Sequence, residues 1–171
     1  MGVPQFLDTI EQTGFSTWLR ESESPFGFYF ILLFHTFGLS LLVGASIVLD
    51  LRLLGAAAGL PLRSLKWLFM VMALGFAINA TTGVLLLLAY PTKTLTNPMF
   101  FVKLTLIAIA LTVMYRIKTR LFDNPLLSDA DMMAKGEGLA RWSLVLWAGA
   151  ITAGRLLAYT ATYLVYGVRG G

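Results

Sequence analysis

Residues 142–168, WSLVLWAGAITAGRLLAYTATYLVYGV, form an apolar stretch long enough to cross a bilayer, and their one charge, Arg155, lies near the middle. Residues 94–115, TLTNPMFFVKLTLIAIALTVMY, form a second such stretch with one charge, Lys103. Neither stretch contains Asp or Glu. A charge at the bilayer centre costs at least about 2.5–3.5 kcal/mol, so it usually faces a protein interior or a wet cavity and serves a function. We therefore expect the anion that pairs with these cations to belong to a ligand.

Two further stretches, residues 24–49 and 67–92, carry no charge at all. A transmembrane helix needs about 20 residues to cross a hydrocarbon core of roughly 30 Å, and each of the four stretches meets this length. The chain is 57% hydrophobic and 13% charged, whereas a soluble domain has about 25% charged residues. The sequence predicts an all-α, integral-membrane four-helix bundle over residues 25–171. Its expected spans are 25–49, 67–91, 97–115 and 142–167.

The N-terminal segment, residues 1–24, differs from the spans because it carries four acidic residues and one Arg. Its large apolar residues recur at helical spacing, at Leu7, Ile10, Phe15, Trp18 and Leu19. This pattern predicts an amphipathic helix that lies in the membrane interface.

The loops that join the spans differ in their content of Lys and Arg. The loops after the first and third spans hold eight of these residues, and the opposite side holds three. The positive-inside rule places the eight in the cytoplasm, so we expect a multi-pass protein of the bacterial inner membrane with both termini periplasmic. The net charge of +4 therefore reports topology and does not indicate nucleic-acid binding. At the cytoplasmic end of the first span, Asp50 and Arg52 are expected to form a local ion pair.

Polar residues of the spans fall at one predicted depth. Counting about 1.5 Å per residue from the span centres places His35, Asn79 and Arg155 near the middle of the membrane. Lys103 lies about 5 Å nearer the outside by the same count. Tyr159 follows Arg155 by one helical turn and shares its face. We expect these side chains to point into the bundle, because each helix must satisfy its polar groups internally.

Several strings of this chain resemble an uncharacterised family of small bacterial four-helix membrane proteins. They are TWLRES at 17–22, HTFGLSLLVGASIVLDLRLLG at 35–55, GFAINATTGVLLL at 75–87, NPMFFVKL at 97–104 and WAGAITAGRLLAY at 147–159. The resemblance covers most of the chain. It implies a four-helix membrane protein and no particular activity.

A remoter resemblance concerns chemistry. A His in the first span and a Lys shortly after an Asn-Pro entry into a later span are similar to the copper-resistance D membrane family and to four-helix membrane protoporphyrinogen oxidases. In those families such residues are linked to haem or porphyrin handling, and His35 and Lys103 match them here. The chain has one His, so it lacks the further histidines that a di-haem cytochrome or a His-rich copper site requires.

The first hypothesis is therefore an intramembrane site for a flat, anionic, hydrophobic ligand, namely haem b or a porphyrin. His35 would be the axial metal ligand, as a neutral imidazole. Lys103 and Arg155 would pair with the propionates, while Asn79 and Tyr159 would donate or accept hydrogen bonds around them.

Two alternatives use the same polar layer differently. The first is a small oligomeric transporter or channel for an anionic or metal-linked solute, since cations in a pore select anions. The second is an accessory subunit of a larger membrane complex. The sequence contains no Cys and shows neither a Ser–His–Asp set nor a phosphate-binding loop, so it assigns no reaction and leaves open whether the protein is an enzyme.

Overall fold

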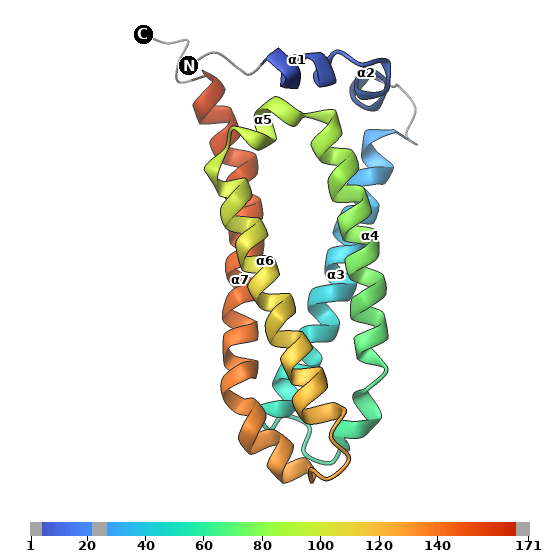
Figure 1. Cartoon of the computed structure of the whole chain (residues 1–171), viewed down its shortest axis with the longest axis vertical. Coiled ribbons are helices and arrows are strands. Elements are labelled where there is room, and N and C mark those ends of the chain that lie inside the picture. The colour runs from blue at the N-terminus through green and yellow to red at the C-terminus, as the bar shows by residue number, and fades with distance from the viewer. Residues whose placement is uncertain (1–4, 22–26, 167–171) are drawn as a thin grey trace.

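The structure, a computed structural model, describes residues 5–21 and 27–166 (Figure 1). Every regular element in these ranges is a helix, and 85% of the structure is helical. The elements follow in the order α1 (Gln5–Glu11), α2 (Gly14–Glu21), α3 (Phe28–Leu53), η1 (Leu62–Leu65), α4 (Leu68–Ala89), α5 (Pro91–Leu95), α6 (Pro98–Ile117), η2 (Lys118–Phe122) and α7 (Asp129–Tyr166). The prediction of an all-α chain is confirmed.

Three stretches of helix are long and apolar enough to cross a membrane. They are Phe28–Leu53, Leu62–Ala89 and Pro98–Phe122. The long helix α7 is not among the spans found in the described part of the chain; its first third is polar and charged, and its apolar part contains Arg155. The first three expected spans thus lie on helices of the required length, while a fourth crossing by α7 stays a prediction.

The four long helices form two close pairs. Helix α3 packs along α4 and α6 packs along α7, and the pairs meet through contacts between α3 and α7. Helices α4 and α6 make few close contacts, and Figure 1 shows them separated over the half of the molecule nearer α5. We call this half the α5 end and the opposite half the η1 end. The core concentrates at the η1 end, where the side chains of Leu49, Leu53, Leu62, Ile117 and Trp147 are at most 1% exposed.

Two glycines let the backbones of α3 and α4 touch. A Cβ at Gly38 would lie 2.8 Å from the backbone N of Asn79, and a Cβ at Gly75 would lie 2.6 Å from the backbone N of Leu42. Real Cβ atoms do not approach so closely, so both positions require glycine at this helix separation. Small residues commonly permit such close contact between membrane helices. This contact fixes the position of His35, one turn before Gly38, against α4.

The N-terminal segment is two short helices rather than the single amphipathic helix that the sequence predicted. Helices α1 and α2 are separated at Gln12 and Thr13, and they lie across the α5 end of the long helices (Figure 1). Leu7 and Leu19 are buried there. The Ser16 hydroxyl donates to the backbone O of Leu88 at 2.8 Å, so it satisfies a carbonyl at the end of α4 that has no partner within the helix.

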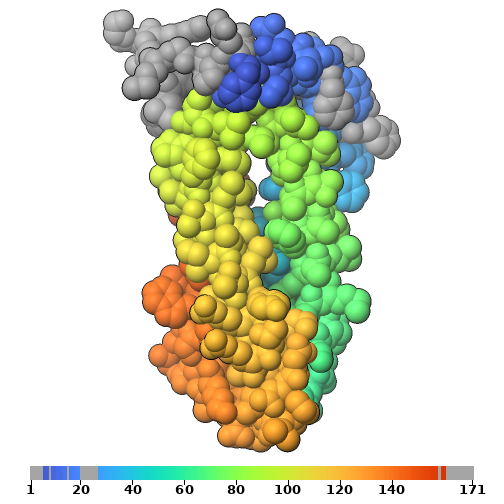
Figure 2. Space-filling model, in the orientation of Figure 1, coloured from blue at the N-terminus to red at the C-terminus, as the bar shows by residue number. Residues whose placement is uncertain are grey.

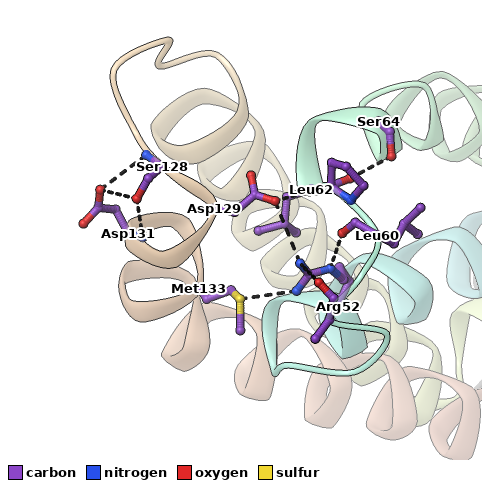
Figure 3. A network of polar contacts seen from close by, with 10 residues as sticks. Arg52, Leu60, Leu62, Ser64, Ser128, Asp129, Asp131 and Met133 are labelled. Carbon is purple, nitrogen blue, oxygen red and sulfur yellow. Dashed lines mark hydrogen bonds and ion pairs between the residues drawn. The ribbon is translucent and has the colours of Figure 1, made fainter.

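At the η1 end, Arg52 of α3 contacts both the loop that follows α3 and the start of α7 (Figure 3). Its Nε donates to the backbone O of Leu60 at 2.6 Å, and one terminal guanidinium nitrogen lies 3.8 Å from Oδ2 of Asp129 at the start of α7. The same Asp129 oxygen accepts the backbone N–H of Leu62 at 2.9 Å. The expected Asp50–Arg52 ion pair is therefore wrong. Residues two positions apart face different sides of a helix, and Arg52 points toward the loop and α7 instead.

Candidate functional site

A cavity of about 510 Å³ lies between α4 and α6 at the α5 end. Figure 2 shows an opening between the surfaces of these two helices, through which part of α3 is visible. Most of the cavity wall is aliphatic or aromatic, and its polar members are His35, Asn79, Thr94 and Lys103. The cavity exists because α4 and α6 belong to different helix pairs and do not pack closely over this half.

The imidazole of His35 is oriented by the backbone and side chains of α4. Its Nδ1 lies 3.1 Å from the backbone O of Asn79 and 3.1 Å from the hydroxyl oxygen of Thr82. The Thr82 hydroxyl itself donates to the backbone O of Ile78 at 2.7 Å, so it can accept a hydrogen bond from the imidazole. Two acceptors at Nδ1 favour the neutral tautomer that carries its proton there. The other ring nitrogen, Nε2, then holds the lone pair that a metal ligand needs.

Asn79 completes this arrangement from α4. Its amide nitrogen donates to the backbone O of His35 at 2.8 Å, a carbonyl that the α3 helix leaves able to accept a second bond. The same nitrogen lies 3.4 Å from both Nδ1 and Nε2 of His35, which is longer than an ordinary N–H···N hydrogen bond. Gly83 leaves room beside the ring, because a Cβ there would lie 3.3 Å from Cε1 of His35. Asn79 therefore positions the imidazole of His35, and Gly83 leaves space beside the ring.

Lys103 enters the cavity from α6. Its aliphatic stem packs against Gly154 of α7, where a Cβ would lie 3.7 Å from Cδ and 3.9 Å from Nζ. The side chain is half-buried. Among residues 5–21 and 27–166, no carboxylate lies within ion-pair distance of its ammonium group. The cavity thus holds a cation without an anion, in apolar surroundings where an unpaired charge is costly.

The structure brings together three of the five predicted site residues. His35, Asn79 and Lys103 line the same cavity. Arg155 and Tyr159 lie on the exposed face of α7, so the expectation that they point into the bundle is wrong. Arg155 directly follows Gly154, the residue that contacts Lys103. Its direction differs because Ala153 and Gly154 form the packing face, and the next residue is turned by about 100° from it.

A buried polar cluster at the η1 end was not predicted. Asp50 is fully buried, and its Oδ2 lies 3.4 Å from the hydroxyl of Ser46. That hydroxyl accepts the indole N–H of Trp147 at 2.8 Å and lies 3.4 Å from the hydroxyl of Ser143. Oδ1 of Asp50 has no hydrogen-bond partner among the described residues. The sequence signal was the spacing of four residues within each helix, Ser46 to Asp50 in α3 and Ser143 to Trp147 in α7.

His35 is the one histidine of the chain, and the chain has no cysteine. Within the described part of the chain, no three His, Cys, Asp or Glu side chains gather into a group that could hold an ion. A metal at His35 would therefore be held chiefly by a cofactor. Comparisons of the chain with protein-family models, with curated protein sequences and with solved structures gave no match, so they assign neither a family nor an activity.

Proposed function

We propose that this chain is an integral membrane protein in which α3, α4, α6 and α7 all cross the bilayer as a four-helix bundle. Three of these helices are apolar and long enough, and α7 packs along α6 over its apolar part. Helices α1 and α2 then lie at the periplasmic interface, next to α5. The membrane in this proposal is the bacterial inner membrane. The Lys and Arg residues that set the orientation gather at the η1 end, which therefore faces the cytoplasm.

The function that we propose is binding of a flat, apolar, anionic ligand between α4 and α6. The observation that carries this proposal is that Lys103 shares an apolar cavity with His35 and has no carboxylate partner among the described residues. A volume of about 510 Å³ lies within the usual range of roughly 300–1,000 Å³ for small-molecule sites. An anionic group on the ligand would neutralise the ammonium group, and the apolar walls would bury the remaining surface.

Haem or a porphyrin is the ligand that fits this set of groups best. Its ring is flat and apolar, one propionate would pair with Lys103, and Nε2 of His35 would bind the iron. Among the described residues that line the cavity there is no Met, so His35 would be the ligand that they offer to the iron of a haem. Arg155 lies outside the cavity, so Lys103 is the one cationic side chain among the described residues that line the cavity.

The transporter alternative has less support from the packing. The cavity occupies the α5 end, while Leu49, Leu53, Ile117 and Trp147 fill the η1 end with almost no exposed surface. A path across the membrane would require this core to open. The packing therefore favours a binding site that is reached from one side or from the lipid.

Titration of protoporphyrin IX into the purified protein tests the proposal. We expect saturable binding of one porphyrin per chain, weakened about tenfold or more in Lys103→Met because a charge-assisted hydrogen bond within apolar surroundings is lost. Lys93→Met is the matched control, since Lys93 is exposed on α5 near the same end. The dimethyl ester of protoporphyrin, which lacks the charges, should bind wild type and Lys103→Met alike. Equal binding of the free acid by wild type and Lys103→Met would contradict the proposal.

A further inference from the structure

A second hollow, of about 590 Å³, lies between α4 and α6 at the η1 end. We call it the lower groove. Its walls are apolar and include Met70, Ala73, Phe76 and Leu111, and its mouth is formed by Lys66, Trp67, Tyr115 and Lys118. It is separate from the porphyrin cavity, although Phe76 and Leu111 line both.

The charges at the mouth favour an anion. The ammonium groups of Lys66 and Lys118 converge on Asp123, at 2.9 Å and 2.7 Å from its two carboxylate oxygens. Two cations thus share one carboxylate and leave a net positive charge beside the groove. Trp67 and Tyr115 are 60% and 67% exposed at the same level, as amphipathic rings are at a membrane–water interface.

The length of the groove matches one leaflet. From Lys66 to Phe76 the chain advances ten residues, which is about 15 Å along a helix. Half of a hydrocarbon core of roughly 30 Å has the same depth. An acyl chain can therefore lie along the groove from the mouth to Phe76 while its headgroup remains at the interface.

We infer that the lower groove is a binding site for an anionic phospholipid of the leaflet at the η1 end. Its phosphate accepts hydrogen bonds from the N–H groups of Lys66 and Lys118 that do not point at Asp123, and one acyl chain packs against Met70, Ala73 and Leu111. The inference rests on the membrane placement in the proposed function and not on porphyrin binding. The two sites use different polar residues, so either can fail alone.

Lipid binding to the detergent-purified protein, measured by native mass spectrometry, tests the inference. Phosphatidylglycerol should bind more tightly than phosphatidylcholine with the same acyl chains. Lys66→Gln/Lys118→Gln should reduce that preference by about fivefold per lysine, whereas Lys135→Gln, an exposed residue of α7 outside the groove, should not. Asp123→Asn should increase the preference, because it removes the carboxylate that competes with the phosphate.

A bulky residue in the groove distinguishes binding of a lipid within the groove from general attraction of anionic lipids to the basic surface. Ala73→Phe should weaken the binding of both lipids. Free glycerol phosphate, which has no acyl chain, should not compete with phosphatidylglycerol. A far-UV circular dichroism spectrum and a melting temperature like those of wild type show that the fold of each variant is intact. Equal binding of the two lipids by wild type, affinities for both lipids that are unchanged in Ala73→Phe, or a lipid-free dimer closed over the groove would each overturn the inference.

Discussion

Substitution of Gly38 by Ala should separate α3 from α4 and disturb the site. The new Cβ would lie 2.8 Å from the backbone N of Asn79 and 2.9 Å from the backbone O of Gly75. Both contacts are to backbone, so relief requires one helix to move by several tenths of an ångström. Overpacking of this kind costs about 1–3 kcal/mol, against a gain of up to roughly 1 kcal/mol from the higher helix propensity of Ala. We expect a net loss of stability of about 1–2 kcal/mol.

Gly44 provides the matched control on the same helix. A Cβ there meets no other atom within 4 Å, so Gly44→Ala should be neutral or slightly stabilising. Unfolding of the two variants in detergent, followed by circular dichroism, gives the comparison. Gly38→Ala should also weaken porphyrin binding, because the shift moves the backbone O of Asn79 away from His35. If Gly38→Ala and Gly44→Ala unfold alike and bind porphyrin alike, the close contact of α3 and α4 is not what positions the site.

Three further predictions concern the charges and the topology. Asp50→Asn should not lower the melting temperature, because a neutral amide is less costly to bury than a carboxylate without a cation. A marked loss of stability would contradict this, because it would show that Oδ1 of Asp50 has a partner. The hydrogen bonds from Lys118 and Lys66 lower the pKa of Asp123. Its contribution to stability is therefore present above the ordinary carboxyl pKa and is lost as the pH falls through the lowered pKa, and Asp123→Asn should remove this part of the acid dependence in pH-dependent melts. A reporter that is active only in the cytoplasm should be inactive when fused to the C-terminus; an active fusion would reverse the proposed orientation.

The helices were predictable because their signal is local. Uncharged runs of sufficient length mark α3 and α4, and Asn97-Pro98 marks the start of α6, where the Asn97 side chain accepts the backbone N–H of Met99 at 2.9 Å. The end of α3 was placed four residues early, since Asp50 and Arg52 were treated as interfacial. Contacts with α7 and the following loop satisfy Arg52 and let the helix continue to Leu53.

For the site, the sequence predicted the level of His35 and Asn79 along their helices, but not which side of its helix Arg155 faces. Residue counting placed His35 and Asn79 at one level, and they are in contact. For α7 the polar stripe through Arg155 was assumed to face inward, whereas the small residues Ala150, Ala153 and Gly154 form the packing face. Small residues at the contact are the better signal for packed membrane helices. The cavity itself depends on which helices pair, and no residue pattern within one helix contains that information.

The most direct measurement of the central claim is the absorption spectrum of ferric haem titrated into wild type and His35→Ala. If His35 offers Nε2 to the iron, wild type should shift the Soret band and saturate at one haem per chain. His35→Ala should lose the shift and still bind metal-free protoporphyrin, because Lys103 and the apolar walls remain. Identical spectra and affinities for the two proteins would contradict the account, since haem would then be bound without the imidazole of His35.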